Sequence, residues 1–139
     1  MLGTLRFAQP TSLAKCCHQR YLELFHGPDF ATLALAGVRW QTPHWASTGT
    51  KNPDYSDVLY VEPLIGKESI NTLPDATLAA FRDHGRALDT LGEGLAEAQL
   101  HLAALVASGI DLDKVGETLQ VDGVRIFAAA YDQLLAAVR

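Results

Sequence analysis

The sequence predicts an α/β protein with two short parallel strands and otherwise mostly helices. Two short segments, 44–47 and 69–73, are bounded by Pro and turn residues, as short strands are. The residues between them are enough for a crossover helix and its loops, which adjacent parallel strands require. The remaining segments, and the C-terminal part 86–139 above all, repeat their apolar residues at the spacing of helices.

Length and charge exclude several classes of protein. The 139 residues are 48% hydrophobic, which is enough for one compact domain. The formal net charge is -5 and no basic block is present, so we expect no nucleic-acid partner. The longest uncharged apolar runs, 30–38 and 100–110, are well short of the roughly 18 residues of a membrane span. The N-terminus also lacks the apolar run of a secretory signal, so we expect a soluble, cytoplasmic protein with no membrane partner.

The first predicted helix covers residues 12–25, with Ser12 available as its N-cap. Its apolar residues recur at steps of three and four, which is the spacing of one helix face. They are Leu13, Cys17, Tyr21, Leu24 and Phe25. Since Gly27 and Pro28 interrupt the pattern, a second short helix is predicted over 29–36, ending at Gly37.

The two cysteines, Cys16 and Cys17, are adjacent in the sequence. Adjacent cysteines form a disulfide only through a strained geometry, and a disulfide scaffold has several spaced cysteines. We therefore expect reduced, at least partly buried thiols, with a redox or metal role as the alternative.

The segments that follow the two strands are predicted to be helical. Residues 55–65 have the pattern of a helix that Pro63 shortens or kinks, with Gly66 at its end. After the second strand, Pro74 and Asp75 open a helix that runs to His84 and is capped by Gly85.

The C-terminal part is predicted to contain three helices. One extends from Leu88 to the neighbourhood of Gly109, and the last covers 124–138. Between them, Asp111 provides an N-cap and the residues after it an acidic first turn. The apolar stripes also resemble coiled-coil seams, but each covers only two to three heptads, so packing onto a domain core is favoured.

Two parallel strands cannot form a closed sheet, and both would have unpaired edges. Two alternatives follow. Either the chain folds as a helical bundle around a rudimentary ribbon, or it is one portion of a larger α/β domain that contains further strands.

The segment 44–53 is the best candidate for a binding site. It gathers three hydroxyls, a glycine, a lysine and an amide directly after a strand, and ligands bind at the carboxyl ends of parallel strands. Hydroxyls, free backbone N–H groups and a lysine are typical of phosphate sites, although such a segment is often only a turn. The Walker pattern is absent. The five histidines are scattered without metal-site spacing, so we expect no metal.

The segment Trp45-Ala46-Ser47-Thr48-Gly49-Thr50-Lys51-Asn52-Pro53, with the residues that continue it, closely resembles transaldolases of the longer bacterial type. The similarity extends from about Leu13 to the C-terminus, whereas residues 1–12 are divergent. The matching segments are Trp45–Val61, Leu64–Gly66, Asn71–Leu78, Arg82–Gly85, Gly109–Leu112, Asp122–Val124 and Leu134–Ala137.

The resemblance implies a (β/α)₈ barrel that transfers a dihydroxyacetone unit between sugar phosphates in the pentose phosphate pathway, through a lysine Schiff base and without a cofactor. Such a barrel needs roughly 250 residues. Residues 13–139 are therefore similar to its C-terminal portion only, with the seventh strand near 44–47 and the eighth near 69–73. We expect the barrel not to be closed by this chain alone.

The same resemblance implies that no catalytic residue lies in this chain. In the family the nucleophilic lysine is on the fourth strand and the acid/base carboxylates are on the first and third, all of which would precede Met1. Of the four lysines here, only Lys114 approaches the family pattern, and it lies on a C-terminal helix without a pocket to lower its pKa. Pro63, where relatives usually have an acidic residue, is a further departure. The chain alone is expected to be inactive.

The phosphate side of the site is what the resemblance does assign to this chain. Ser47 and Lys51 match positions that face substrate phosphate, while Trp45 is expected to pack between barrel and outer helix. Further candidates to line the site are Thr48, Asn52, Asn71 and Thr72. The expected partners are a sugar phosphate and either a second copy or a chain that supplies the missing strands. The alternative function is a non-catalytic helical fragment or interaction module that completes a barrel with another chain.

Overall fold

The computed structural model describes residues 10–138, so most of the divergent segment 1–12 lies outside the described residues. The chain divides into two compact units, 1–102 and 103–139, where composition had predicted one. No single helix among the described residues is long and apolar enough to cross a membrane. Two consecutive C-terminal helices, Leu95–Ala107 and Leu112–Val138, pass that test only as a pair, which is bent by 83° at the break.

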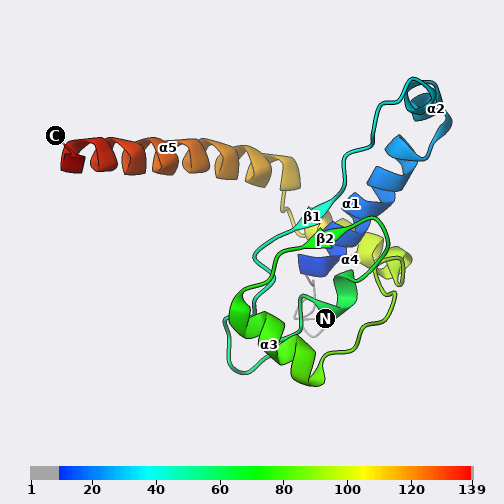
Figure 1. The fold of residues 1–139 in the computed structure, drawn as a ribbon, viewed down its shortest axis with the longest axis horizontal. Helices are drawn as coiled ribbons and strands as arrows, with labels where there is room; N and C mark the ends of the chain where they lie inside the picture. The colour runs from blue at the N-terminus through cyan, green and yellow to red at the C-terminus, as the bar shows by residue number, and fades with distance from the viewer. Residues whose placement is uncertain (1–9, 139) are drawn as a thin grey trace. The chain divides into compact units, whose positions relative to one another are not determined.

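The first unit contains two parallel strands, β1 (His44–Trp45) and β2 (Ile70–Asn71), which lie side by side in Figure 1. The amide of Ile70 donates to the carbonyl of Pro43 at 2.9 Å, and the amide of Thr72 donates to that of Trp45 at 3.0 Å. The parallel pair confirms the prediction, but each strand is only two residues long. Pairing stops early after β1 because Ser47 has a left-handed backbone, with φ of 58°.

The first helix, α1 (Pro10–Phe25), starts earlier than predicted and buries a different face. Ser12 lies inside the helix, and its hydroxyl hydrogen-bonds His101 Nδ1 at 3.1 Å, so the N-cap prediction was wrong. Tyr21 is buried as expected, but Leu13 is 51% exposed. Contacts of polar side chains such as Ser12, and not the apolar stripe alone, determine which side of α1 faces the core.

The cysteines of α1 are both free thiols, as predicted. Cys16 is part-buried, but Cys17 is exposed, so the expectation of burial was wrong for Cys17. Leu13, one turn before Cys17 on the same side of the helix, is exposed as well.

The short helix α2 (Pro28–Leu35) confirms the second predicted helix, and Gly37 beyond its end has φ of 84°. Phe30 is its buried residue, and its ring contacts that of Phe25 edge to face at 5.1 Å between centroids. This contact joins α2 to the end of α1.

Residues 55–65 do not form the predicted helix. They form turns that end in a 3₁₀-helix, η2 (Glu62–Leu64). The amide of Val61 donates to the carbonyl of Val58 at 3.0 Å, and that of Leu64 donates to Val61 at 3.1 Å. Pro63 removes a donor that a longer helix would use. The three-residue spacing of these buried residues therefore arises from successive turns and not from an α-helix.

The helix after β2, α3 (Asp75–His84), has the predicted bounds. Gly85 follows it with an extended backbone, φ of -70°, so it is not a left-handed cap. A side chain at this position would collide with the ring of Phe81, at 2.2 Å from its nearest atom. Gly85 is therefore required for close packing on Phe81 and not for backbone freedom.

The next helix, α4 (Leu95–Ala107), begins later than predicted. Residues 88–90 have no regular structure and 91–94 form turns; the amides of Thr90 and Leu91 both donate to the carbonyl of Ile65 at 2.9 Å. Leu91 is 2% exposed and lies in the apolar core of the first unit. The other buried apolar residues of this unit are Tyr21, Phe30, Val58, Val61, Leu64 and Ala98.

The last helix, α5 (Leu112–Val138), is one continuous helix of 27 residues in place of the two predicted. Asp111 is its N-cap as predicted, since Asp111 Oδ1 accepts from the amide of Lys114 at 3.1 Å. No residue of α5 is buried, and Phe127 is 80% exposed. The prediction that its apolar stripe packs onto a core was therefore wrong within the described chain.

Candidate functional site

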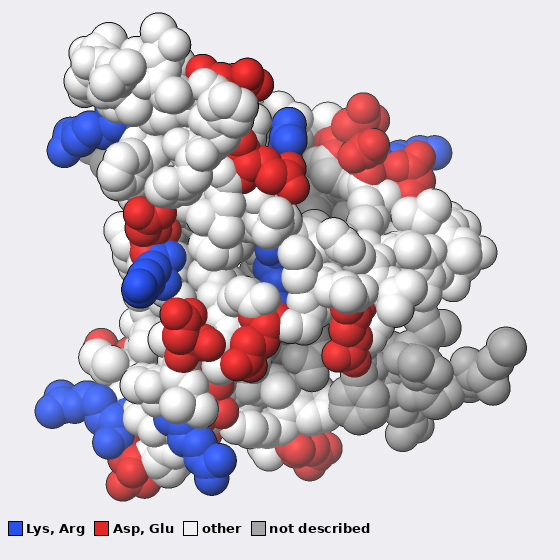
Figure 2. Space-filling view, turned by 90° about the vertical axis from the view of Figure 1, so that its right-hand side faces the viewer, with Lys and Arg blue, Asp and Glu red and all other residues white. Residues whose placement is uncertain are grey.

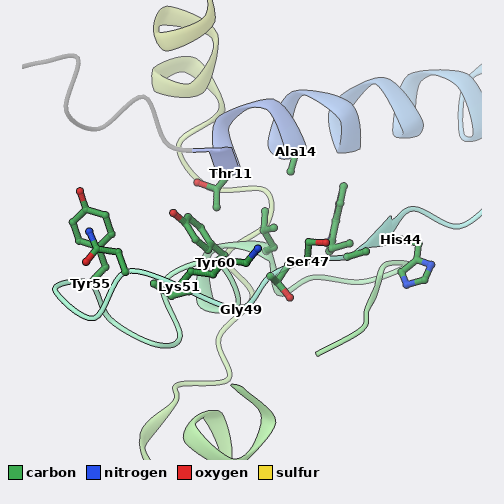
Figure 3. A pocket seen from close by; sticks show the side chains of 14 residues that line it. Thr11, Ala14, His44, Ser47, Gly49, Lys51, Tyr55 and Tyr60 are labelled. Carbon is green, nitrogen blue, oxygen red and sulfur yellow. The ribbon is translucent and has the colours of Figure 1, made fainter. Parts of the chain in front are cut away.

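The candidate site is a cavity of about 630 Å³ at the end of β1. Figure 3 shows the first turns of α1, with Thr11 and Ala14, beside the loop that bears Ser47 and Lys51. Its lining comes from α1, from β1 and its following loop, from the turns before η2 and from η2 itself. The lining residues are Thr11, Ala14, His44, Trp45, Ala46, Ser47, Thr48, Gly49, Thr50, Lys51, Asn52, Tyr55, Tyr60 and Leu64.

The loop that follows β1 turns at Ser47, whose φ of 58° is uncommon for a residue other than glycine. A left-handed backbone costs free energy, so the surrounding contacts must hold it. One such contact is made by Thr48, which is 4% exposed and donates its hydroxyl to Asn71 Oδ1 at 2.7 Å.

Gly49 fixes the middle of the loop against the start of α3. A Cβ at this position would lie 3.1 Å from both Pro74 Cγ and Thr77 Oγ1, which is tighter than an ordinary contact. Thr77 is itself buried. The loop therefore packs on the first turn of α3 because residue 49 has no side chain.

The far end of the loop contains Lys51 and Asn52. Asn52 Oδ1 accepts from the amide of Asp54 at 3.0 Å, which is the Asx-turn arrangement. This turn reverses the chain, and Tyr55 then follows on the cavity wall. Lys51 is exposed, so its ammonium group is accessible to a ligand from solvent.

The electrostatics of the cavity differ from those of the whole chain. The chain has a net charge of -5, and acidic and basic side chains lie interspersed on the face that Figure 2 shows. The lining residues of the cavity include no carboxylate, and Lys51 is their one formally charged side chain. Hydroxyl, amide and ammonium donors without a carboxylate favour an anion.

The structure brings four of the predicted site residues together on this cavity, namely Ser47, Thr48, Lys51 and Asn52. Asn71 and Thr72 lie outside its lining and contact it indirectly. Asn71 accepts from Thr48, and Thr72 Oγ1 lies 3.0 Å from His44 Nε2.

Several lining residues were missed by sequence reasoning. Thr11 and Ala14 are far from the loop in sequence, and Tyr60 falls in a segment that was predicted as a helix, so no local pattern indicated them. Trp45 was expected to pack between two layers. It lines the cavity, and its buried indole N–H has no hydrogen-bond partner among the described residues.

A second, smaller cavity of about 180 Å³ adjoins the start of α1 and contains Lys15. The ammonium group donates to the carbonyl oxygens of Thr90 at 3.0 Å and of Glu93 at 2.7 Å. Partial burial lowers the pKa of Lys15, against the attraction of Glu93 and Glu97. Because its donors are directed at backbone carbonyls, Lys15 joins α1 to the turns before α4.

Two histidine clusters lie outside both cavities. His26 Nε2 is 2.7 Å from Glu68 Oε2, which also accepts from the hydroxyl of Tyr21 at 3.0 Å. Burial and this carboxylate raise the pKa of Tyr21 to about 12. No group of three or more His, Cys, Asp or Glu side chains in residues 10–138 is arranged to bind a metal ion.

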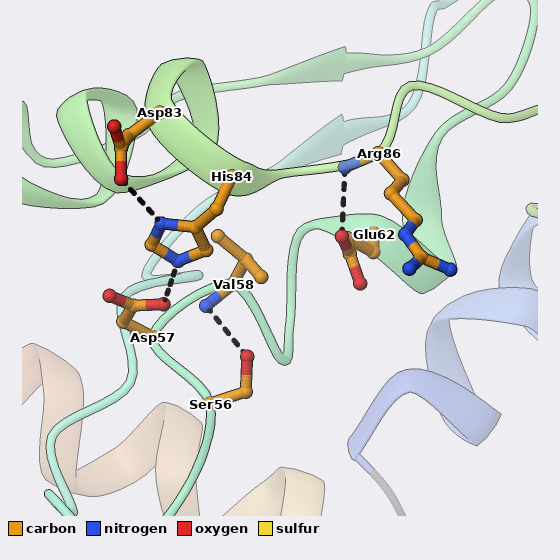
Figure 4. Close-up of polar contacts among 7 residues, drawn as sticks. All are labelled: Ser56, Asp57, Val58, Glu62, Asp83, His84 and Arg86. Carbon is orange, nitrogen blue, oxygen red and sulfur yellow. Dashed lines mark hydrogen bonds and ion pairs between the residues drawn. The ribbon is translucent and has the colours of Figure 1, made fainter.

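The second histidine cluster joins the end of α3 to the loop before η2 (Figure 4). His84 Nε2 lies 2.9 Å from Asp57 Oδ1, and His84 Nδ1 lies 3.1 Å from Asp83 Oδ2. The hydrogen bonds to Asp57 and then to Asp83 raise the pKa of His84. Beside it, Glu62 Oε1 accepts from the amide of Arg86 at 2.9 Å.

Comparisons with known proteins were made over the whole chain. A family model described as transaldolase/fructose-6-phosphate aldolase matches residues 5–138. The transaldolase of Thiobacillus denitrificans is 52% identical over 135 residues, which is 97% of this chain and 38% of that protein. A transaldolase of Neisseria meningitidis is 49% identical over 90% of this chain and 36% of its own length. Transaldolase 1 of Streptomyces coelicolor is 42% identical over 99% of this chain and 38% of its own length.

The chain thus spans little more than a third of the length of these curated relatives. The match still covers nearly all of the chain itself, and the identity is high across it. The chain therefore belongs to the transaldolase/fructose-6-phosphate aldolase family.

Proposed function

We propose that this chain forms the phosphate-binding side of a transaldolase site, in which Ser47 and Lys51 hold the phosphate of a sugar phosphate. The observation that supports this most is the composition of the cavity lining. It contains hydroxyl and amide groups and one lysine, but no carboxylate, in a chain with a net charge of -5. A dianionic phosphate fits such a lining.

The proposed barrel is a (β/α)₈ barrel in which β1 and β2 are the seventh and eighth strands. Barrel enzymes often bind substrate phosphate at the loops after these two strands, and the cavity lies directly after β1. The parallel pairing of β1 with β2 supports the assignment. The remaining strands would pair with the outer edges of this two-stranded sheet.

In this proposal the reacting groups come from outside the 139 residues. The dihydroxyacetone unit is carried as a Schiff base on a lysine of another strand, and carboxylates of further strands transfer the protons. Holding the phosphate fixes the far end of the substrate, so that its carbonyl carbon is oriented toward that lysine.

The lysines of this chain do not suit the role of the nucleophile. Lys15 donates to two backbone carbonyls, and Lys51, Lys67 and Lys114 are exposed. We expect the 139-residue chain alone to have no transaldolase activity. Borohydride reduction with fructose 6-phosphate should then trap no adduct on its lysines, and an adduct detected by mass spectrometry would contradict this part of the proposal.

The test uses a chimera in which this chain replaces the aligned 38% of the Thiobacillus denitrificans transaldolase. We expect the chimera to be active, and Ser47→Ala to raise KM for the sugar phosphate about tenfold while kcat changes little, because a hydrogen bond to a charged group is lost. The matched control is Ser108→Ala, at an exposed serine beyond the end of α4 whose hydroxyl bonds the Ala104 carbonyl at 2.8 Å. An active chimera in which both variants have the same KM would refute the phosphate assignment.

A second candidate function is an interaction module that completes a barrel with another chain. The outer edges of the β1–β2 pair have no strand neighbour among the described residues, and α5 buries no residue. We expect the isolated chain to self-associate, and to restore activity when it is mixed with the remainder of the relative expressed separately. A monomer with a sharp cooperative melt that restores nothing would contradict this candidate.

A further inference from the structure

The contact between Thr48 and Asn71 joins the loop after β1 to the end of β2. The hydroxyl of Thr48 donates to Asn71 Oδ1 at 2.7 Å, although the two residues are 23 positions apart in the chain. Thr48 is 4% exposed and Asn71 is half-buried, so this hydrogen bond is part-buried. A buried hydroxyl without its partner would lose free energy, so the bond is expected to persist.

The bond lies where backbone pairing between the strands ends. Trp45 and Asn71 are the last registered pair, and the amide of Thr72 makes the last ladder bond, to Trp45. Immediately afterwards Ser47 turns the chain through a left-handed backbone. The side chain of Thr48 therefore continues the connection between the two segments just beyond that turn.

A second contact fixes the same loop one residue later, at Gly49. Gly49 lies against Pro74 and Thr77, with 3.1 Å from a hypothetical Cβ to each. Thr48 and Gly49 are thus both fixed by residues that follow β2 or belong to it. Ser47 and Lys51, which are on either side of these two positions, line the cavity.

We infer that Thr48 and Asn71 are positioning residues for the phosphate site, a role that rests on the proposed function. Their hydrogen bond holds the left-handed turn at Ser47, and through it the direction of the Ser47 hydroxyl and the path of the loop to Lys51. Neither residue needs to touch the phosphate. Without the bond the loop must be ordered when the ligand binds, so affinity falls.

The experiment measures inhibition of the active chimera by inorganic phosphate, together with KM and kcat. Thr48→Val removes the hydroxyl at nearly constant volume, and we expect a three- to tenfold weaker phosphate inhibition, as for loss of one neutral hydrogen bond. KM for the sugar phosphate should rise by a similar factor, with kcat little changed. Thr48→Ser retains the hydroxyl and should restore both constants.

Asn71→Ala removes the same bond from the acceptor side, at a half-buried position. In the double variant Thr48→Val/Asn71→Ala, phosphate inhibition should be weakened no further than in either single variant, because both substitutions break the same hydrogen bond. The control is Thr118→Val, at an exposed hydroxyl on α5 that bonds the Lys114 carbonyl at 2.9 Å. It should leave phosphate inhibition unchanged.

The possible results distinguish the positioning role of Thr48 and Asn71 from the proposed phosphate site itself. If Ser47→Ala weakens phosphate inhibition but Thr48→Val and Asn71→Ala do not, the positioning role is overturned and the phosphate site stands. If the two single effects multiply in the double variant, the residues act independently and the role is again overturned. If Ser47→Ala does not weaken inhibition, the proposed function itself fails. Should Thr48→Val not fold, Asn71→Ala and Thr48→Ser decide the question.

Discussion

The two segments that follow the strands have different roles, although both leave the same end of one small sheet. After β1 the chain makes a left-handed turn at Ser47 and forms a loop that lines the cavity as far as Asn52. After β2 it enters α3 within four residues, and neither Asn71 nor Thr72 lines the cavity.

The difference shows how a binding loop can be kept in a strained form. The loop after β1 carries the accessible ammonium group of Lys51. The segment after β2 is tied to a helix, and it supplies Asn71, Pro74 and Thr77 as fixed contacts for that loop. In the proposed function, one segment therefore presents the ligand groups, and its neighbour determines where they lie.

The largest expected effect concerns the charge of the first segment. We expect Lys51→Met in the chimera to raise KM for the sugar phosphate about 10- to 100-fold, because a charge-assisted hydrogen bond to phosphate is worth about 1.5–3 kcal/mol. Lys67→Met is the matched control, at an exposed lysine before β2 that does not line the cavity. Steady-state kinetics measure both, and equal KM values would place the phosphate elsewhere.

The next effect concerns the contact between the two segments. Gly49→Ala puts a Cβ at 3.1 Å from Pro74 Cγ and Thr77 Oγ1, so we expect a loss of about 1–3 kcal/mol in the free energy of unfolding. Adding Thr77→Ala removes one of these contacts and should recover part of the loss. Gly92→Ala, which meets no atom within 4 Å, serves as the control in denaturant unfolding. No loss at Gly49 would mean that the loop is not held against α3.

Much of this arrangement could be predicted from local sequence. The positions of both strands follow from the Pro and turn residues that bound them, and α3 follows from Pro74 and Asp75 at its start. Asp111 is the N-cap that its type and place predict. The resemblance to transaldolases indicated Ser47 and Lys51, and both line the cavity. In each case the determining contacts are local or belong to one short motif.

The errors have two causes, which are contacts with residues distant in sequence and local spacings that fit more than one structure. The buried face of α1 is determined partly by the bond from Ser12 to His101, which the apolar stripe does not show. The spacing of Val58 and Val61 fits both a helix and successive turns, and Pro63 decides for the turns. Likewise, nothing near Thr48 in the sequence points to Asn71.

A smaller effect is expected from pH, through the contact that joins α3 to the loop before η2. Hydrogen bonds to Asp57 and Asp83 raise the pKa of His84 above its ordinary 6.5 in the folded protein. The stabilisation that protonated His84 gives the folded protein is therefore fully present below the pKa that His84 has in the unfolded chain. It is lost as pH rises through the raised pKa of His84 in the folded protein. We expect His84→Gln to lower the Tm of the chimera more at about pH 5.5 than at about pH 9. An equal loss of Tm at the two pH values would show that the protonated form of His84 does not contribute to stability.

The smallest effect is expected from Asp75→Asn, and it tests which of the two segments holds the phosphate. Asp75 is exposed in the first turn of α3, where a carboxylate stabilises the helix dipole by about 0.3–1 kcal/mol. We expect the variant to lose about that much stability in denaturant unfolding, with phosphate inhibition of the chimera unchanged. A phosphate bound at the N-terminus of α3 would instead be repelled by Asp75, so removing that charge would strengthen inhibition. Stronger inhibition would thus move the ligand from the loop after β1 to the segment after β2, and the assignment of binding and supporting roles would be reversed.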